Sequence, residues 1–218
     1  MSVLNSRSRG TRPTLALAVF GLFLGLLVVG CLGRSPEVEH FMLGKVQIEA
    51  GGGSRAHSEV AVLVGPVKLP AYLERPQIAT LEENGEVELD ETSRWLGGFE
   101  DNFLRSVSRG LAHDLDSIRI AVAPSSAPFS FDYRIRIHID DFVFVSNRDR
   151  LHARIRWALS SEESDTSPAL FLLETFRELE DDSTEALVEA HEAVIAELVS
   201  QIVAEIDRRE ASPEAGGL

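Results

Sequence analysis

Two segments in the second half of the chain alternate between apolar and polar residues with a period of two. From Tyr133 to Asp140 and from Leu151 to Leu159, every second residue is apolar and most of the residues between are Arg, His or Asp. Successive side chains of a strand point to opposite faces, so this pattern is typical of strands with one buried face. Turn formers at 146–149 predict that the two strands pair antiparallel, and a third strand at 169–177 completes a meander.

Two other segments repeat apolar residues at helical spacing. One runs from Phe99 to Leu115, and the other runs from an N-cap at Ser183 to about Asp207. Shorter strands are predicted at 59–64 (ended by Pro66), at 118–122, and at 77–81 and 86–90, which form a hairpin turned by Asn84 and Gly85. Together the elements predict a single α+β domain, with a mostly antiparallel sheet and two long amphipathic helices packed on one of its faces.

The N-terminal segment differs in composition from the rest of the chain. Three arginines and no acidic residue precede a run of apolar side chains and glycine from Leu15 to Val29, which is the pattern of a signal peptide. The run is shorter than the about 20 residues of a membrane-spanning helix, and it ends at Gly30 and Cys31, the only cysteine. This arrangement resembles a bacterial lipobox, which implies cleavage before Cys31 and attachment of acyl chains such as palmitate. The alternative is an unpaired buried thiol.

The sequence therefore divides into four parts. Residues 1–30 are predicted to be a lipoprotein signal peptide, 31–37 a lipid-anchored linker, 38–209 the α+β domain and 210–218 a disordered tail. Leu32 follows the cysteine, and the sorting rule known for enterobacterial lipoproteins then implies the outer membrane, with the domain facing the periplasm. A linker this short holds the domain within about 25 Å of the membrane.

The net charge of the chain limits the classes of partner that it can bind. Its 218 residues include 21 Lys and Arg against 35 Asp and Glu, a net charge of -14. Such a chain repels phosphate backbones and anionic bilayers. We therefore expect no nucleic-acid partner, membrane contact only through the lipid anchor, and an acidic surface suited to a basic protein. A single cysteine also excludes an internal disulfide framework and a thiolate zinc site.

No segment has the pattern of a catalytic site. His191 and Glu192 begin an HExxH pattern, but Ile195 stands where the second zinc ligand would be. His113 with Asp114, and His138 with Asp140, are interpreted as solvated surface residues. Phosphate-binding and serine-hydrolase motifs are missing from the sequence. We therefore expect no enzyme activity, no metal and no cofactor.

The segment from Leu69 to Thr80, LPAYLERPQIAT, has more proline, aromatic and charged residues than a turn needs. It resembles the LPxYLxRPQIxT signature of the auxiliary lipoproteins of ABC-type MCE lipid-transport systems, the PqiC/YmbA-like family. Arg94 and Trp95, followed by a helix that contains Phe103, are similar to a second block of that family. The sequence departs from the family at His40 and Phe41, where an aromatic pair is usual.

This resemblance implies a non-enzymatic component that works with an MCE-domain protein and with inner-membrane transporter components to move lipids between membranes. Homo-oligomerisation stays open. The residue types of the loop are enriched at energetically important contacts, so we hypothesise partner binding for Tyr72, Arg75, Pro76, Gln77, Arg94 and Trp95. Two alternatives remain. The motif could only lock the loop onto the domain's own sheet, or the protein could be a lipid-anchored periplasmic binding module or carrier that holds a small apolar ligand between sheet and helices.

Overall fold

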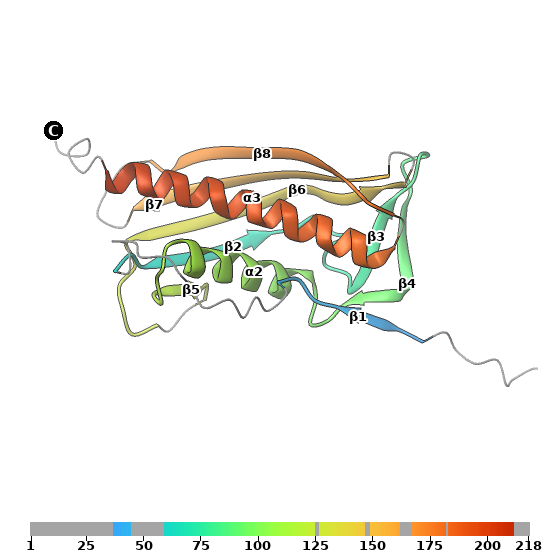
Figure 1. The fold of residues 1–218 in the computed structure, drawn as a ribbon, viewed down its shortest axis with the longest axis horizontal. Helices are drawn as coiled ribbons and strands as arrows, with labels where there is room; N and C mark the ends of the chain where they lie inside the picture. Colours follow the sequence, from blue (N-terminus) through green and yellow to red (C-terminus); the bar gives the residue numbers. More distant parts are fainter. Residues whose placement is uncertain are drawn as a thin grey trace, which may run out of the picture. The chain divides into compact units, whose positions relative to one another are not determined.

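The computed structural model describes residues 37–44, 59–124, 127–146, 149–161, 167–181 and 183–211. The predicted signal peptide, Cys31, Leu32 and nearly all of the predicted linker and tail lie outside the described residues. From Val38 onward the described chain belongs to one compact unit. This unit contains two helices and an eight-stranded, curled sheet (Figure 1).

The elements follow one another in a mixed order along the chain. They are β1 (Glu39–Phe41), β2 (Val62–Lys68), β3 (Gln77–Leu81), β4 (Val87–Trp95), α2 (Phe99–Asp114), β5 (Ile120–Val122), β6 (Tyr133–Val145), β7 (Arg150–Ser161), β8 (Ala169–Glu178) and α3 (Thr184–Glu210). Both helices, the β3–β4 hairpin and the antiparallel meander of β6, β7 and β8 confirm the corresponding predictions. The single α+β domain is confirmed as well.

The sheet is mixed, so the prediction of a mostly antiparallel sheet is wrong. β6 pairs in parallel with both β2 and β3, and the outer strands β5 and β1 run parallel to β2 and β4. Parallel pairing arises because the chain leaves β2 and β3 and returns to β6 only after α2 and β5, which is a crossover and not a hairpin. Alternation in a sequence reports which face of a strand is buried, but it does not report the direction of the neighbouring strand.

β2 also continues past Pro66, where the sequence predicts its end. The pairing register with β6 shifts between Val64 and Val67. Pro66 has no N–H to donate, and proline is tolerated in a sheet at such irregularities because the ladder is interrupted there in any case. The extension brings Lys68 beside His138 of β6.

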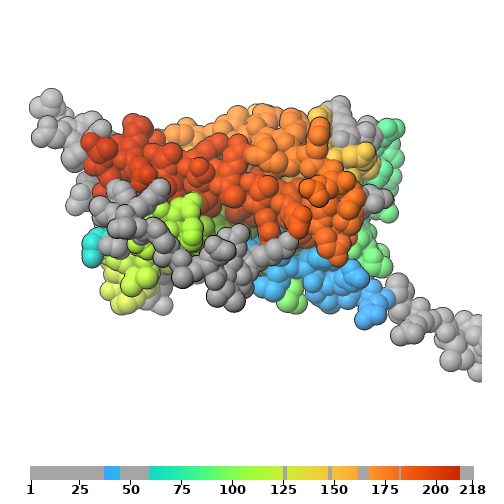
Figure 2. All heavy atoms as spheres, viewed as in Figure 1, coloured from blue at the N-terminus to red at the C-terminus, as the bar shows by residue number. Residues whose placement is uncertain are grey.

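The two helices cover the same face of the sheet. Phe142 of β6 contacts Phe99 of α2 and His191 of α3, with ring centroids 5.5 Å and 4.6 Å away. Figure 2 shows α3 crossing the face that also carries α2. The helices approach each other closely at Gly110, where an added Cβ would lie 2.9 Å from Cγ2 of Val199. The hydrophobic core therefore lies between the sheet and this pair of helices, and neither of the two described helices covers the opposite face of β6, β7 and β8.

Helix α3 begins as its sequence predicts. The hydroxyl of Ser183 accepts a hydrogen bond from the N–H of Ala186 at 3.1 Å, which is the geometry of an N-cap. At the other end, burial would raise the pKa of Glu205, but hydrogen bonds from Arg208 and Arg209 outweigh it and lower that pKa. Within the described ranges, no helix is both long enough and apolar enough to cross a membrane.

Candidate functional site

The loop between β2 and β3 occupies a gap along one edge of β6. β2 pairs with β6 as far as His138, and β3 pairs with it at Phe144 and Val145. Within this interval the N–H of Phe142 donates a hydrogen bond to the hydroxyl of Tyr72 at 3.1 Å. The loop thus joins two strands that lie on the same edge of β6, and Tyr72 bridges the interval between them.

Tyr72 fixes this loop to the domain. Burial raises the pKa of its hydroxyl to about 12, opposed by the hydrogen bond from Phe142 and reinforced by the nearby Asp141. The next residue, Leu73, is buried in the core. These contacts favour the alternative in which Tyr72 locks the loop onto the protein's own sheet.

Arg75 and Pro76 follow Tyr72 in the loop and are exposed. Among the described residues, no side chain forms a hydrogen bond or ion pair with Arg75. The carbonyl of Pro76 accepts a hydrogen bond from the N–H of Trp95 at 2.7 Å, so the end of the loop is tied to β4. The loop therefore presents an unpaired cation on a backbone that is held at two points.

Gln77 and Arg94 face each other across β3 and β4, and His40 of β1 lies in register with Arg94 on its other side. We call Arg75, Pro76, Gln77 and Arg94 the loop patch. Trp95 is separate from it, because its side chain is only 3% exposed and packs edge-on against Phe99 at 5.6 Å between ring centroids. Trp95 thus supports the patch from the core and offers almost no surface to a partner.

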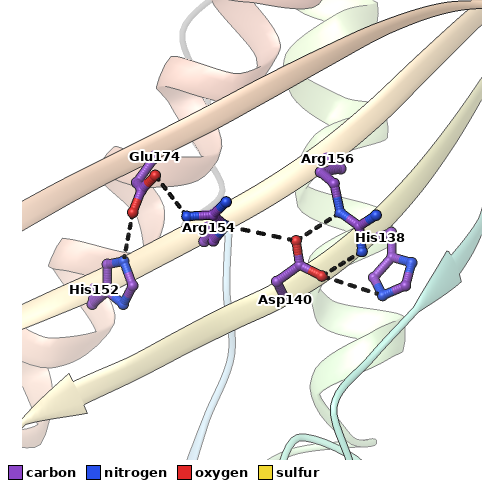
Figure 3. A network of polar contacts seen from close by, with 6 residues as sticks. All are labelled: His138, Asp140, His152, Arg154, Arg156 and Glu174. Carbon is purple, nitrogen blue, oxygen red and sulfur yellow. Dashed lines mark hydrogen bonds and ion pairs between the residues drawn. The ribbon is translucent and has the colours of Figure 1, made fainter.

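The face of the sheet away from the helices carries a charged network that sequence reasoning treats as ordinary solvated surface. Asp140 of β6 accepts two hydrogen bonds from Arg156 of β7, from Nε at 2.7 Å and from Nη2 at 2.6 Å. These hydrogen bonds lower the pKa of Asp140. Figure 3 shows how the network spreads over three strands, through His138 to Asp140 at 3.4 Å, Arg154 to Glu174 at 2.9 Å and His152 to Glu174 at 3.6 Å. We call this face, which neither described helix covers, the open face.

A groove of about 700 Å³ shares His138 and Arg156 with the network and crosses β2, β6, β7 and β8. Each strand contributes three consecutive residues, and the middle residue of a triplet, such as Ile137 or Trp157, is buried toward the helices. Because neighbouring side chains of a strand point to opposite faces, outward side chains form the walls of the groove and main chain forms its floor. The groove was missed from the sequence because its walls come from four separate strands.

His191 lies in the core and takes no part in either surface. Its ring is 3% exposed, stacks on Phe142, and its Nδ1 donates to the carbonyl of Leu187 at 2.8 Å. Burial lowers the pKa of His191 to about 4, against the smaller opposing effect of the Leu187 carbonyl. In the part of the chain that the structure describes, no three His, Cys, Asp or Glu side chains gather as metal ligands.

A family model described as the ABC-type transport auxiliary lipoprotein component matches residues 43–203. The chain belongs to this family. Membership confirms the resemblance carried by the loop motif, and it makes the protein a lipid-anchored component of the cell envelope with an auxiliary role in transport. The family is a transport family and not a known class of enzyme.

Several solved structures are similar to this chain at low sequence identity. The crystal structure of an uncharacterized protein is 13% identical, with a TM-score of 0.62, and the alignment covers 79% of this chain and 99% of the other. A protein from Xanthomonas campestris is 20% identical, with a TM-score of 0.53 and coverage of 78% and 91%. The PelC dodecamer from Paraburkholderia phytofirmans is 12% identical, with a TM-score of 0.39 and coverage of 69% and 93%. No curated protein matches the chain.

Proposed function

We propose that this auxiliary lipoprotein is anchored in the outer membrane, faces the periplasm and docks an MCE-domain protein of an ABC-type lipid-transport system. The family match over residues 43–203 carries the proposal. The loop motif adds to it, because the resemblance of that motif is to the auxiliary lipoproteins of MCE systems. Acylation of Cys31 would supply the anchor.

The loop patch is the docking surface that we propose. Tyr72 and the carbonyl of Pro76 hold the backbone of the loop, so little conformational entropy is lost when a partner binds it. Arg75 presents an exposed guanidinium group, and Arg94 adds a half-buried one whose Nη2 lies 3.6 Å from a carboxylate oxygen of Glu91. Guanidinium groups bind carboxylates in a bidentate geometry. The matching surface on the partner is therefore acidic, in contrast to the basic partner that the net charge alone favours.

The position of the patch in the chain suits a docking role at the membrane. β1, which lies in register with Arg94, begins at Glu39, only a few residues after Cys31. At about 3.3–3.6 Å per extended residue, that stretch of chain holds β1 within about 30 Å of the acylated cysteine. A partner that spans the periplasm would meet the patch near the surface of the outer membrane.

A pull-down of the MCE-domain partner with the full-length lipoprotein tests the proposal. Arg75→Glu should reduce the recovered partner about tenfold or more, as expected for an interface arginine, with no change in melting temperature. Arg105→Glu on α2, which lies outside the patch, is the matched control and should bind normally. Failure of the wild-type protein to retain any MCE-domain partner would reject the function, whereas normal binding by Arg75→Glu would reject only the patch.

The anchor has a separate test. Cys31→Ala should abolish incorporation of a labelled fatty acid, and Leu32→Asp should move part of the protein to the inner-membrane fraction if enterobacterial sorting applies. Equal labelling of Cys31→Ala and wild type would overturn acylation at this residue.

The alternative of a carrier with its ligand between sheet and helices gains no support from that layer. Side chains such as Phe103, Ile135 and Leu198 fill it and are completely buried.

A further inference from the structure

The side chains that line the groove on the open face change from cationic to apolar along its length. The sheet register lays two rows of outward side chains across the strands, and these rows are its walls. One row is Lys68, His138, Arg156 and Leu172, and the other includes Arg136, Ala158 and Leu170. With strands about 4.8 Å apart, the longer row spans about 14 Å. Cations therefore stand at the β2 and β6 end, and leucines stand at the β8 end.

The cations of the groove differ in whether a carboxylate already pairs with them. Arg156 is neutralised by Asp140, which binds it through two hydrogen bonds. Among the described residues, no carboxylate pairs with Lys68 or Arg136, and both side chains are exposed. The β2 and β6 end of the groove thus keeps two free positive charges, on a chain whose net charge is -14.

The opposite end exposes apolar surface at the edge of the sheet. Leu170 is 80% exposed and Leu172 is 49% exposed. Both lie on β8, which pairs with β7 and has no strand on its other side among the described residues. Large apolar side chains that are grouped at one place on the surface mark a binding surface more often than isolated ones do.

We infer that this groove binds an anionic phospholipid, with the headgroup at Lys68 and Arg136 and an acyl chain running toward Leu170 and Leu172. The groove joins two free cations to an apolar end over about the length of a short hydrocarbon chain, and this separation of charge from apolar surface is the chemistry of an amphiphile. The inference adds a lipid site to the chain itself and is independent of partner docking through the loop patch.

The dimensions and the floor of the groove favour an acyl chain over a protein segment. Its walls are side chains two residues apart on each strand, or about 7 Å, whereas an α-helix with its side chains is about 10–12 Å wide. The main-chain groups of the floor already bond to neighbouring strands. An extended peptide laid across the strands would therefore lose water from its own N–H and C=O groups without gaining partners, and a hydrocarbon chain has no such groups.

Native mass spectrometry of the full-length protein in a non-ionic detergent tests the inference. The wild-type protein should retain phosphatidylglycerol about tenfold more than phosphatidylcholine, because charge-assisted hydrogen bonds to the two cations act only on the anionic headgroup. The double variant Lys68→Gln and Arg136→Gln should remove this preference and leave phosphatidylcholine binding unchanged. Leu170→Ser with Leu172→Ser should reduce the retention of both lipids.

Matched controls separate the groove from general surface effects. Arg105→Gln removes a cation from α2, and Ile118→Ser removes a side chain that is 96% exposed outside the groove; both variants should behave as wild type. Equal retention of the two lipids by the wild type, or an unchanged preference in Lys68→Gln and Arg136→Gln, would overturn the inference. Displacement of phosphatidylglycerol by millimolar inorganic phosphate would also overturn it, by showing a simple anion site.

The pull-down with the MCE-domain partner distinguishes a failure of this inference from a failure of the proposed function. The groove variants should retain the partner as wild type does. Loss of the partner in these variants, with no lipid preference in the wild type, would assign the open face to protein docking and would contradict the lipid site.

Discussion

The two faces of the β6–β7 pair show how one alternating pattern serves two purposes. On the covered face, Ile135, Ile139 and Leu159 are fully buried against the helices. On the open face, Arg156 is bound to Asp140, and the side chain of Arg156 remains 55% exposed. The covered face therefore contributes most of the folding free energy, since buried apolar area sets that contribution. The open face is free to vary its charges, because exposed ion pairs contribute little to stability.

The difference also shows why an average over the whole chain misleads. A net charge of -14 favours a surface that repels anions. The open face instead concentrates arginines from β6 and β7, because the alternation of these strands sends every Arg to the side away from the helices. A local basic surface can therefore exist on an acidic protein.

The largest effect should come from a truncation on the covered face. Phe103 is fully buried and stacks on Phe99 with ring centroids 5.9 Å apart. Phe103→Ala should lower the free energy of unfolding by about 3–5 kcal/mol, from lost burial and the cavity left behind. Urea denaturation measures it. If Phe103→Ala lost less stability than Asp140→Asn on the open face, the covered face would not be the main source of folding free energy.

Acid should act next most strongly, through His191 on the covered face. The pKa of His191 falls from 6.5 to about 4 in the folded protein. Between these two pH values the imidazole is protonated in the unfolded chain but not in the folded protein. Stability is therefore lost as the pH falls from about 6.5 to about 4, by at most about 3 kcal/mol at 1.36 kcal/mol per pKa unit. Melting curves at pH 7 and pH 4.5 should show a smaller difference for His191→Leu than for wild type. An equal difference would show that other groups cause the acid sensitivity.

A smaller loss is expected where the two helices of the covered face touch. Gly110→Ala would place a Cβ 2.9 Å from Cγ2 of Val199. Overpacking of this kind costs about 1–3 kcal/mol, and the better helix propensity of alanine returns about 1 kcal/mol, so the melting temperature should fall by a few degrees. Adding Val199→Ala should remove the steric part of the loss. A double variant that behaves as the sum of two independent losses would argue against this contact.

The smallest effect should come from the open face. Asp140→Asn removes a carboxylate whose pKa is lowered by the Arg156 hydrogen bonds. A lowered pKa stabilises the folded protein above the unfolded pKa of the carboxyl, and this contribution is lost as the pH falls through the folded value. At pH 7 the melting temperature should change less than in Gly110→Ala, because Arg156 can turn to water. A larger change would show that the network carries part of the fold.

The elements that the sequence predicted are those that local periodicity encodes. The helix at Phe99, the Ser183 cap and the meander each depend on residues within one or two turns or on a short connection. The parallel partners of β6 depend on residues that are distant in the chain, and no local pattern reports them. The predicted strand at 118–122 is reduced to β5, with Ile118 almost fully exposed, because an apolar residue carries no information on whether another element covers it.

The candidate sites also differ in how much of each can be recognised from local sequence. The loop motif was visible as a continuous stretch, but only the fold separates Tyr72, which bonds to Phe142, from Arg75, which has no described partner. Trp95 could not be assigned to the core from the sequence, because an aromatic residue beside an arginine is equally typical of an interface. The groove brings together Lys68, Arg136 and Leu170, and each of these alone is an ordinary surface residue of its strand.

The pairing of β2 and β3 along one edge of β6 has a consequence for the order in which the protein matures. Ala61, next to β2, bonds to Asp132, next to β6, across 71 residues of chain. Both N-terminal strands leave the ribosome, and under the proposed export cross the inner membrane, well before the strand that they pair with. Closing such long loops is slow compared with forming a hairpin. β3 can pair with β4 as soon as that strand follows, but the edges of β2 and β3 that face β6 must wait until β6 has also been exported.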